Sequence, residues 1–121
     1  MKKNVLIVDD SLYMRTIIKD ALSSADYNIV GQASSGEEAI DLAMSLKPDL
    51  VTLDNILPDM IGIDILRVIK EEGLESKVII VSAVGQQSVI EEGMGLGADE
   101  YIVKPFTTEK IVGAADRAFA S

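Results

Sequence analysis

Short apolar runs recur along the chain, and each is followed by a stretch whose apolar positions lie three and four residues apart. Short apolar runs between polar or turn residues are typical of strands buried in a parallel sheet, and the longer spacing predicts amphipathic helices. The predicted strands are residues 3–8, 27–33, 50–53, 78–81 and 100–103. Polar residues alternate within the second run, which indicates a strand at the sheet edge.

Hydroxyl or carboxyl side chains stand where the intervening helices would begin, and such side chains accept hydrogen bonds from free first-turn amides. The candidates are Ser11 or Asp10 for the first helix, Ser35 with Glu38 as a capping box for the second, and Thr107 or Thr108 for the last. The second helix must end before Pro48, and Gly73 ends the third. The expected inward positions are Leu12, Met14, Ile17, Ile18, Ala21 and Leu22 in the first helix, and Ala39, Ile40, Ala43, Met44 and Leu46 in the second.

Strand and helix alternate five times without a linker, repeat or low-complexity segment. This pattern predicts an α/β fold, a doubly wound parallel sheet of five strands with five helices. We therefore expect residues 1–121 to form a single domain. Two glycines in the helix predicted at 86–96, Gly93 and Gly95, weaken that helix; they mark either close packing or a helix that is easily remodelled.

Composition excludes several classes of function. The chain has 121 residues, 48% of them hydrophobic, with no cysteine and no histidine, so disulfides, thiolate metal sites and histidine chemistry are excluded. A net charge of −9 repels nucleic-acid phosphates, so we expect no nucleic-acid binding. No apolar run approaches the ~20 residues of a membrane span, and the start lacks a secretory core. We expect a cytoplasmic protein without membrane insertion.

Chemically active side chains follow several of the predicted strands. Asp9 and Asp10 follow the first, Asp54 the third, Ser82 ends the fourth, and Lys104 follows the fifth. Each has an ordinary structural explanation as a cap, a turn residue, a loop hydroxyl or a solvated charge. The carboxyl ends of parallel strands, however, meet at one edge of the sheet, where ligands bind in open α/β folds. Their joint placement favours a functional site.

The residue types at this edge suit phosphate chemistry. Three carboxylates in one crevice repel one another unless a cation neutralises them, and oxygen ligands without histidine or cysteine favour Mg²⁺. Lys104 supplies a positive charge and Ser82 a hydroxyl, both suited to a phosphoryl group. A carboxylate can itself act as the nucleophile and form an aspartyl-phosphate.

These motifs resemble the receiver domains of two-component response regulators. The matching pieces are Val8-Asp9-Asp10, Asp54 with Pro58 and Gly62, Val81-Ser82-Ala83, and Lys104-Pro105-Phe106, and together they span essentially the whole chain. The resemblance, rather than the hydrophobic pattern, implies a flavodoxin-like sheet with strand order 2-1-3-4-5. It also implies that the Lys104–Pro105 peptide bond is cis.

The resemblance implies a role for each matching position. Asp54 is the expected phosphoacceptor, with a histidine kinase as phosphodonor, and the protein is a stoichiometric acceptor rather than an enzyme acting on other substrates. The expected Mg²⁺ ligands are Asp10, Asp54 and the backbone carbonyl of Ile56, with Asp9 in the outer sphere. Ser82 and Lys104 contact the phosphoryl oxygens, and the rotamer of Tyr101 reports the state.

Within the family, residues 8–15 and 82–87 are most similar to single-domain chemotaxis regulators. This likeness implies an output through protein binding, on the surface of the fourth helix, fifth strand and fifth helix, to a protein of the motility apparatus or its adaptor. Ile61 stands where a polar residue is common, from which we expect only a changed loop. Ile56 and Val84 cannot orient an attacking water, so we expect slow self-dephosphorylation and an external phosphatase.

Two other functions remain open from the sequence. A phosphorelay intermediate would pass its phosphoryl group to another histidine protein, and the residues do not separate this role from a motility output. A Mg²⁺-dependent aspartyl-phosphate phosphatase would need an Asp-x-Asp motif after the first strand, whereas Asp9 and Asp10 are adjacent, and it would need a cap domain, for which no segment is available.

Overall fold

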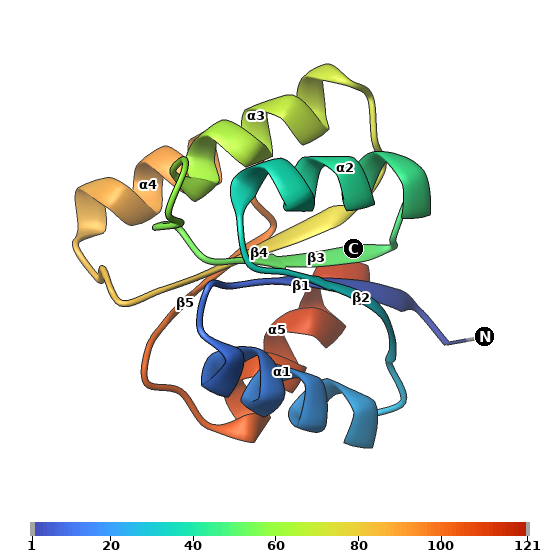
Figure 1. The fold of residues 1–121 in the computed structure, drawn as a ribbon. Helices are drawn as coiled ribbons and strands as arrows, with labels where there is room; N and C mark the ends of the chain where they lie inside the picture. Colours follow the sequence, from blue (N-terminus) through green and yellow to red (C-terminus); the bar gives the residue numbers. More distant parts are fainter. Residues whose placement is uncertain (1, 121) are drawn as a thin grey trace.

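The computed structural model describes residues 2–120 and has the predicted α/β architecture (Figure 1). Five parallel strands form one sheet in the order β2-β1-β3-β4-β5, which confirms the expected topology and the edge position of β2. The strands are β1 (Asn4–Val8), β2 (Asn28–Ala33), β3 (Leu50–Leu53), β4 (Lys77–Ser82) and β5 (Glu100–Val103). The helices are α1 (Leu12–Ser24), α2 (Gly36–Leu46), α3 (Gly62–Glu71), α4 (Gln87–Gly95) and α5 (Thr108–Ala120).

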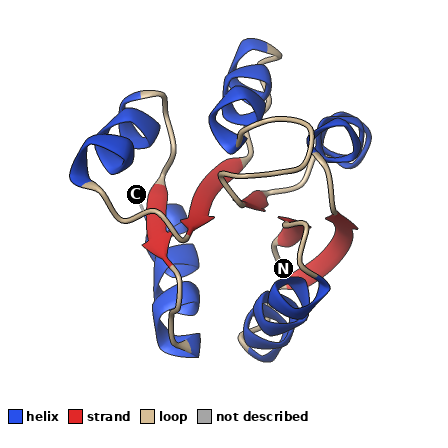
Figure 2. Cartoon of the chain, turned by 60° about the vertical axis from the view of Figure 1, so that its left-hand side comes forward, coloured by secondary structure: helices blue, strands red, loops and turns tan. Residues whose placement is uncertain are grey.

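The sheet separates two hydrophobic layers, and Figures 1 and 2 show helices on both of its sides. Helices α1 and α5 cover one face, and α2, α3 and α4 cover the other. Alternate residues of each strand point to opposite faces, so Val5 and Ile7 join the α1/α5 core while Leu6 and Val8 join the other core. No helix among residues 2–120 is long and apolar enough to cross a membrane.

The helix starts are fixed by the hydroxyl side chains that the sequence offers. Ser11 accepts a hydrogen bond from the Met14 amide, and Thr107 accepts one from the Lys110 amide, each at 3.2 Å. At α2, Ser35 accepts from the Glu38 amide, but the Glu38 carboxylate accepts from the Ser34 amide at 2.8 Å. The reciprocal bond of a capping box is therefore displaced by one residue.

Three expected core positions are wrong. Leu12 is 67% exposed, and Met44 and Leu46 are also exposed. Leu12 is the first residue of α1 and lies beyond the carboxyl ends of the strands, where little of the sheet remains to cover it. Helix α2 fully buries only the small residues Gly36, Ala39 and Ala43, while Ile40 and Leu42 pack against the same core as partly buried side chains.

The two glycines of α4 differ in their surroundings. Gly93 is buried, and a Cβ there would lie 2.8 Å from the Ile80 side chain and 3.7 Å from the Tyr101 ring. Gly95 faces open space, with no atom within 4 Å of the position that a Cβ would take. Gly93 therefore marks close packing of α4 on β4 and β5, whereas packing does not explain Gly95.

Candidate functional site

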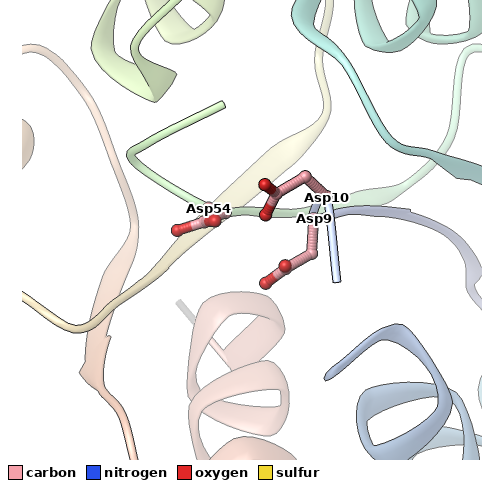
Figure 3. A group of neighbouring side chains, drawn as sticks. All are labelled: Asp9, Asp10 and Asp54. Atoms are coloured by element: carbon pink, nitrogen blue, oxygen red, sulfur yellow. The ribbon is translucent and has the colours of Figure 1, made fainter. Parts of the chain in front are cut away.

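The three acids meet at the carboxyl edge of the sheet, as the strand ends predict (Figure 3). Asp9, Asp10 and Asp54 each offer a carboxylate oxygen, and these oxygens all lie within 4.8 Å of one another. Backbone bonds that extend the ladders fix their positions, because the Asp9 amide donates to the Ala33 carbonyl and the Asp54 amide to the Val8 carbonyl. Asp9 and Asp54 are buried, while Asp10 is exposed and keeps its access to solvent.

Lys104 brings a positive charge to the same cluster from the end of β5. Its ammonium nitrogen lies 2.8 Å from Oδ2 of Asp9 and 3.5 Å from Oδ1 of Asp54. The Lys104 amide donates to the Ser82 carbonyl, which ties this residue to the end of β4. The peptide bond from Lys104 to Pro105 is cis, as the resemblance implies.

The pKa of the Asp54 carboxyl is raised above its ordinary value, even though the Lys104 ammonium is near. Burial raises the pKa of the Asp54 carboxyl, and the nearby Asp9 carboxylate raises it further. Lys104 and the amide of Ile56 lower this pKa, but the net direction is upward. Bringing a second positive charge close to Asp54 would relieve this repulsion.

The donor set fits a hard divalent cation such as Mg²⁺. All three side chains offer carboxylate oxygens, and the exposure of Asp10 leaves room for the waters that Mg²⁺ retains. Asp9 is less available, because Oδ1 accepts from the Ser11 amide at 2.9 Å and Oδ2 contacts Lys104. This difference agrees with direct ligation by Asp10 and Asp54 and an outer role for Asp9, which stays a prediction.

Ser82 and Tyr101 both bind the peptide of Val84 in the loop between β4 and α4. The buried Ser82 hydroxyl accepts from the Val84 amide at 3.1 Å, and the Tyr101 hydroxyl donates to the Val84 carbonyl at 2.7 Å. Tyr101 is half-buried, and its ring lies near Gly93 of α4. One loop residue thus connects the end of β4 with the side chain of β5 that the resemblance names as the state reporter.

The loop between β3 and α3 (residues 54–61) is compact and carries Ile56. An antiparallel bridge joins Ile56 to Ile61, and the Gly62 amide donates to the Asn55 carbonyl at 2.7 Å. Both isoleucine side chains are exposed, and that of Ile56, 60% exposed, lies on the outside of the loop. A Cβ at Gly62 would lie 2.5 Å from the Asp54 carbonyl oxygen, so glycine permits this close return of the chain.

Sequence reasoning missed one residue that contacts the site's backbone. Arg15 of α1 donates to the Asp9 carbonyl at 2.6 Å and to the Gln32 side chain at 3.1 Å. It therefore links α1 to the end of β2 and to the residue that follows β1. The sequence shows that Arg15 follows the acid pair by a few residues. It does not show that an arginine in the first turns of a helix donates to a backbone carbonyl.

Comparisons with known proteins agree with this geometry. The family model of the response regulator receiver domain matches residues 5–116. The chemotaxis protein CheY of Thermotoga maritima is 42% identical over 97% of this chain and 98% of its own length. Protein CcdB of Bacillus subtilis is 44% identical over 93% of this chain and 94% of its own length.

The fold agrees with solved structures as well. The CheX–CheY–BeF3–Mg complex from Borrelia burgdorferi contains a chain with a TM-score of 0.95 and 34% identity, which covers 98% of this chain and 90% of that chain. The match to the family model spans nearly all of the sequence, including the acids, Ser82 and Lys104. The chain therefore belongs to the response regulator receiver domain family of two-component systems.

Proposed function

We propose that this protein is a phosphorylation-activated switch that takes a phosphoryl group from a histidine kinase onto Asp54. The observation that carries the proposal is the convergence of three carboxylates within 4.8 Å, with Lys104 contacting two of them. The family is consistent with phosphorylation-dependent signalling. The same residues support the expected use of Mg²⁺ by Asp10, Asp54 and the Ile56 carbonyl.

In the proposed transfer, a carboxylate oxygen of Asp54 attacks the phosphorus of the kinase phosphohistidine. The new P–O bond forms as the P–N bond breaks, and the electron pair of the broken bond stays on the imidazole nitrogen, which takes a proton. Lys104, already 3.5 Å from Asp54, pairs with the phosphoryl oxygens. A bound Mg²⁺ supplies positive charge that neutralises the acids and the phosphoryl oxygens.

The proposed switch uses Ser82 and Tyr101. A phosphoryl group adds nearly two negative charges and three acceptor oxygens beside the end of β4, which attracts the Ser82 hydroxyl. Such a move breaks the hydrogen bond that the Ser82 hydroxyl accepts from the Val84 amide. Tyr101 then responds, because its hydroxyl donates a hydrogen bond to the carbonyl of the same residue. Shifting a two-state equilibrium from 1:99 to 99:1 takes about 5.5 kcal/mol, and charge-assisted hydrogen bonds of about 1.5–3 kcal/mol each supply most of it.

We further propose an output in chemotaxis, through a protein of the motility apparatus or its adaptor. The support is that relatives such as the Thermotoga CheY are named chemotaxis proteins, together with the similarity that residues 8–15 and 82–87 show to chemotaxis regulators. The Borrelia relative was solved together with CheX, and we propose a protein of that kind as a partner here. Partner binding would use α4, β5 and α5.

The central test is phosphorylation by acetyl phosphate with Mg²⁺, followed by intact-mass measurement. We expect wild type to gain the mass of one phosphoryl group and Asp54→Asn to gain none. Asp20→Asn, which removes an exposed carboxylate from α1, is the matched control and should behave as wild type. Phosphorylation of Asp54→Asn to the same extent as wild type would contradict the assignment of Asp54.

A second experiment separates the switch from the alternatives. We expect a single stoichiometric phosphorylation and no turnover of a generic phosphate ester, whereas turnover would favour a phosphatase. A pull-down with the phosphorylated protein then identifies the partner. A partner that carries an acceptor histidine, and becomes labelled on it, would favour the phosphorelay role over a motility output.

A further inference from the structure

The tip of the loop after β3 is attached to the first turn of α2. Asp59 accepts hydrogen bonds from two successive amides of α2, with Oδ1 2.7 Å from the Gly36 nitrogen and Oδ2 3.0 Å from the Glu37 nitrogen. These bonds lower the pKa of the Asp59 carboxyl, so it is ionised at neutral pH. We name this pair of bonds the Asp59 clasp.

The packing around the clasp is specific. The Met60 side chain occupies the space that a Cβ at Gly36 would take, so glycine at this position lets the loop lie directly on the helix start. Gly36 is buried, and the remaining first-turn amide, that of Glu38, is already paired with Ser35. The α2 terminus and the loop tip therefore complete each other's hydrogen bonding.

The clasp acts on the proposed metal site through the loop. The Leu57 amide donates to the Met60 carbonyl at 3.1 Å, and Ile56 is bridged to Ile61. Residues 56 and 57 are therefore held by the segment that Asp59 anchors. The Ile56 side chain is largely exposed, and its amide is 3.5 Å from Asp54 Oδ1, so Ile56 has little anchorage of its own.

We infer that Asp59 is a positioning residue, which holds the Ile56 carbonyl in place for the divalent cation by fastening the loop to α2. The inference rests on the proposed function, because Ile56 matters only if its carbonyl binds the metal. Groups that orient metal ligands affect affinity strongly, typically by about 10- to 100-fold when removed. The effect of Asp59 should lie at the low end of this range, because Asp59 acts on the ligand only through the backbone of the loop. We expect a loss of about 10-fold in Mg²⁺ affinity when it is replaced by alanine.

The test compares Asp59→Ala, Asp59→Asn and Ser35→Ala with wild type. Asp59→Asn keeps one acceptor oxygen, so its effects should lie between those of wild type and Asp59→Ala. Ser35→Ala is the matched control, because it removes a bond from the same helix start without touching the loop. Asp41→Asn, on the exposed side of α2, controls for the loss of one negative charge.

Two readouts are needed. In metal-free protein, amide hydrogen exchange should become severalfold faster at Leu57 and Gly62 in the Asp59 variants and stay unchanged there in Ser35→Ala. In Mg²⁺ titrations of folded protein, the dissociation constant should rise for the Asp59 variants and stay at the wild-type value for both controls. A purely structural cap would lower stability without changing the Mg²⁺ dissociation constant of the folded protein.

Each contrary result has a clear meaning. Unchanged exchange at Leu57 and Gly62 would overturn the clasp as an anchor of the loop. Faster exchange with an unchanged Mg²⁺ dissociation constant would overturn its link to the metal site. Failure of the wild-type protein to bind Mg²⁺ would overturn the proposed function, and this inference with it. This outcome is distinguishable, because it is observed on wild type before any variant is measured.

Discussion

The ammonium of Lys104 lies 2.8 Å from a carboxylate oxygen of Asp9 and farther, at 3.5 Å, from one of Asp54. Among residues 2–120, Lys104 is the only positive side chain that pairs with these carboxylates. Its ion pair with the buried Asp9 is the shorter and therefore the stronger of the two. Asp54 keeps a raised pKa, mainly because it is buried and secondly because Asp9 is near. Asp54, the proposed nucleophile, is therefore less compensated by Lys104 than the buried Asp9, which leaves it available for a cation or a phosphoryl group.

This arrangement predicts that Asp54→Asn stabilises the metal-free protein at neutral pH, by about 1 kcal/mol. A carboxyl whose pKa is higher in the folded than in the unfolded state costs stability at pH values above the folded pKa. The cost disappears as the pH falls through the folded and then the unfolded pKa, so the advantage of the variant should shrink on acidification. Urea unfolding of wild type and Asp54→Asn over a series of pH values measures this difference in the free energy of unfolding.

Excess Mg²⁺ should reverse this order. A cation that binds only the folded state stabilises wild type by mass action, and the variant lacks one of the proposed ligands. Adding a chelator should therefore lower the stability of wild type more than that of Asp54→Asn. A variant that is less stable than wild type in metal-free buffer at neutral pH would contradict the electrostatic argument.

Tyr101→Phe tests the connection between β5 and the Val84 peptide. The change removes the 2.7 Å hydrogen bond but keeps the ring beside Gly93. We expect a loss of about 1 kcal/mol in the free energy of unfolding and faster amide exchange in residues 83–86. Tyr13→Phe, which removes a hydroxyl from a side chain that is 74% exposed, is the control and should change neither quantity. Equal effects of the two variants would exclude a special role for the Tyr101 hydroxyl.

The sequence predicted the elements and the convergence of the acids because both depend on local pattern. Short apolar runs locate the strands and helical spacing locates the helices, and strand ends in a parallel sheet necessarily share an edge. Strand order is a long-range property, and here it came from the family resemblance. Periodicity also marked Leu12 as inward, although a helical stripe does not indicate where the sheet beneath it ends.

The contacts that the sequence did not predict join separate elements, and those of Asp59 with Gly36 and of Arg15 with Gln32 join segments distant in the chain. Asp59 bonds to Gly36, and Arg15 bonds to the Asp9 carbonyl and to Gln32. The targets of Asp59 and one target of Arg15 are backbone groups, which every residue carries, so the sequence offers no partner to match. Glu38 likewise selected the amide of Ser34 instead of that of Ser35, a choice decided by the path of the loop before α2.

The glycines of α4 provide a matched pair for stability. Gly95→Ala should raise the free energy of unfolding by about 0.5–1 kcal/mol, because alanine favours the helix and its methyl group enters open space. Gly93→Ala gains the same propensity, but its methyl would lie 2.8 Å from Ile80, and we expect a net loss of about 1–3 kcal/mol from overpacking. Thermal or urea unfolding of both variants checks this order. A stabilising Gly93→Ala would show that α4 shifts without cost.

Ile56 provides a test of the lifetime of the phosphorylated state. Its side chain is apolar, exposed and two residues from Asp54, so it cannot orient a water toward an aspartyl-phosphate. Ile56→Asn introduces an amide at this position, and we expect severalfold faster loss of the phosphoryl group, since a positioned water attacks more readily than a disordered one. The measurement is the decay of the phosphorylated form in Mg²⁺, followed by intact mass.

Ile61→Asn is the matched control for that experiment. Ile61 is also exposed and is the bridge partner of Ile56, so the two variants place the same amide on the same loop. Position 56 is two residues after Asp54, the proposed phosphoacceptor, whereas position 61 is seven residues after it. Only Ile56→Asn should therefore speed the decay. Equal decay of wild type and Ile56→Asn would contradict the prediction, and equal acceleration by both variants would attribute the effect to loosening of the loop.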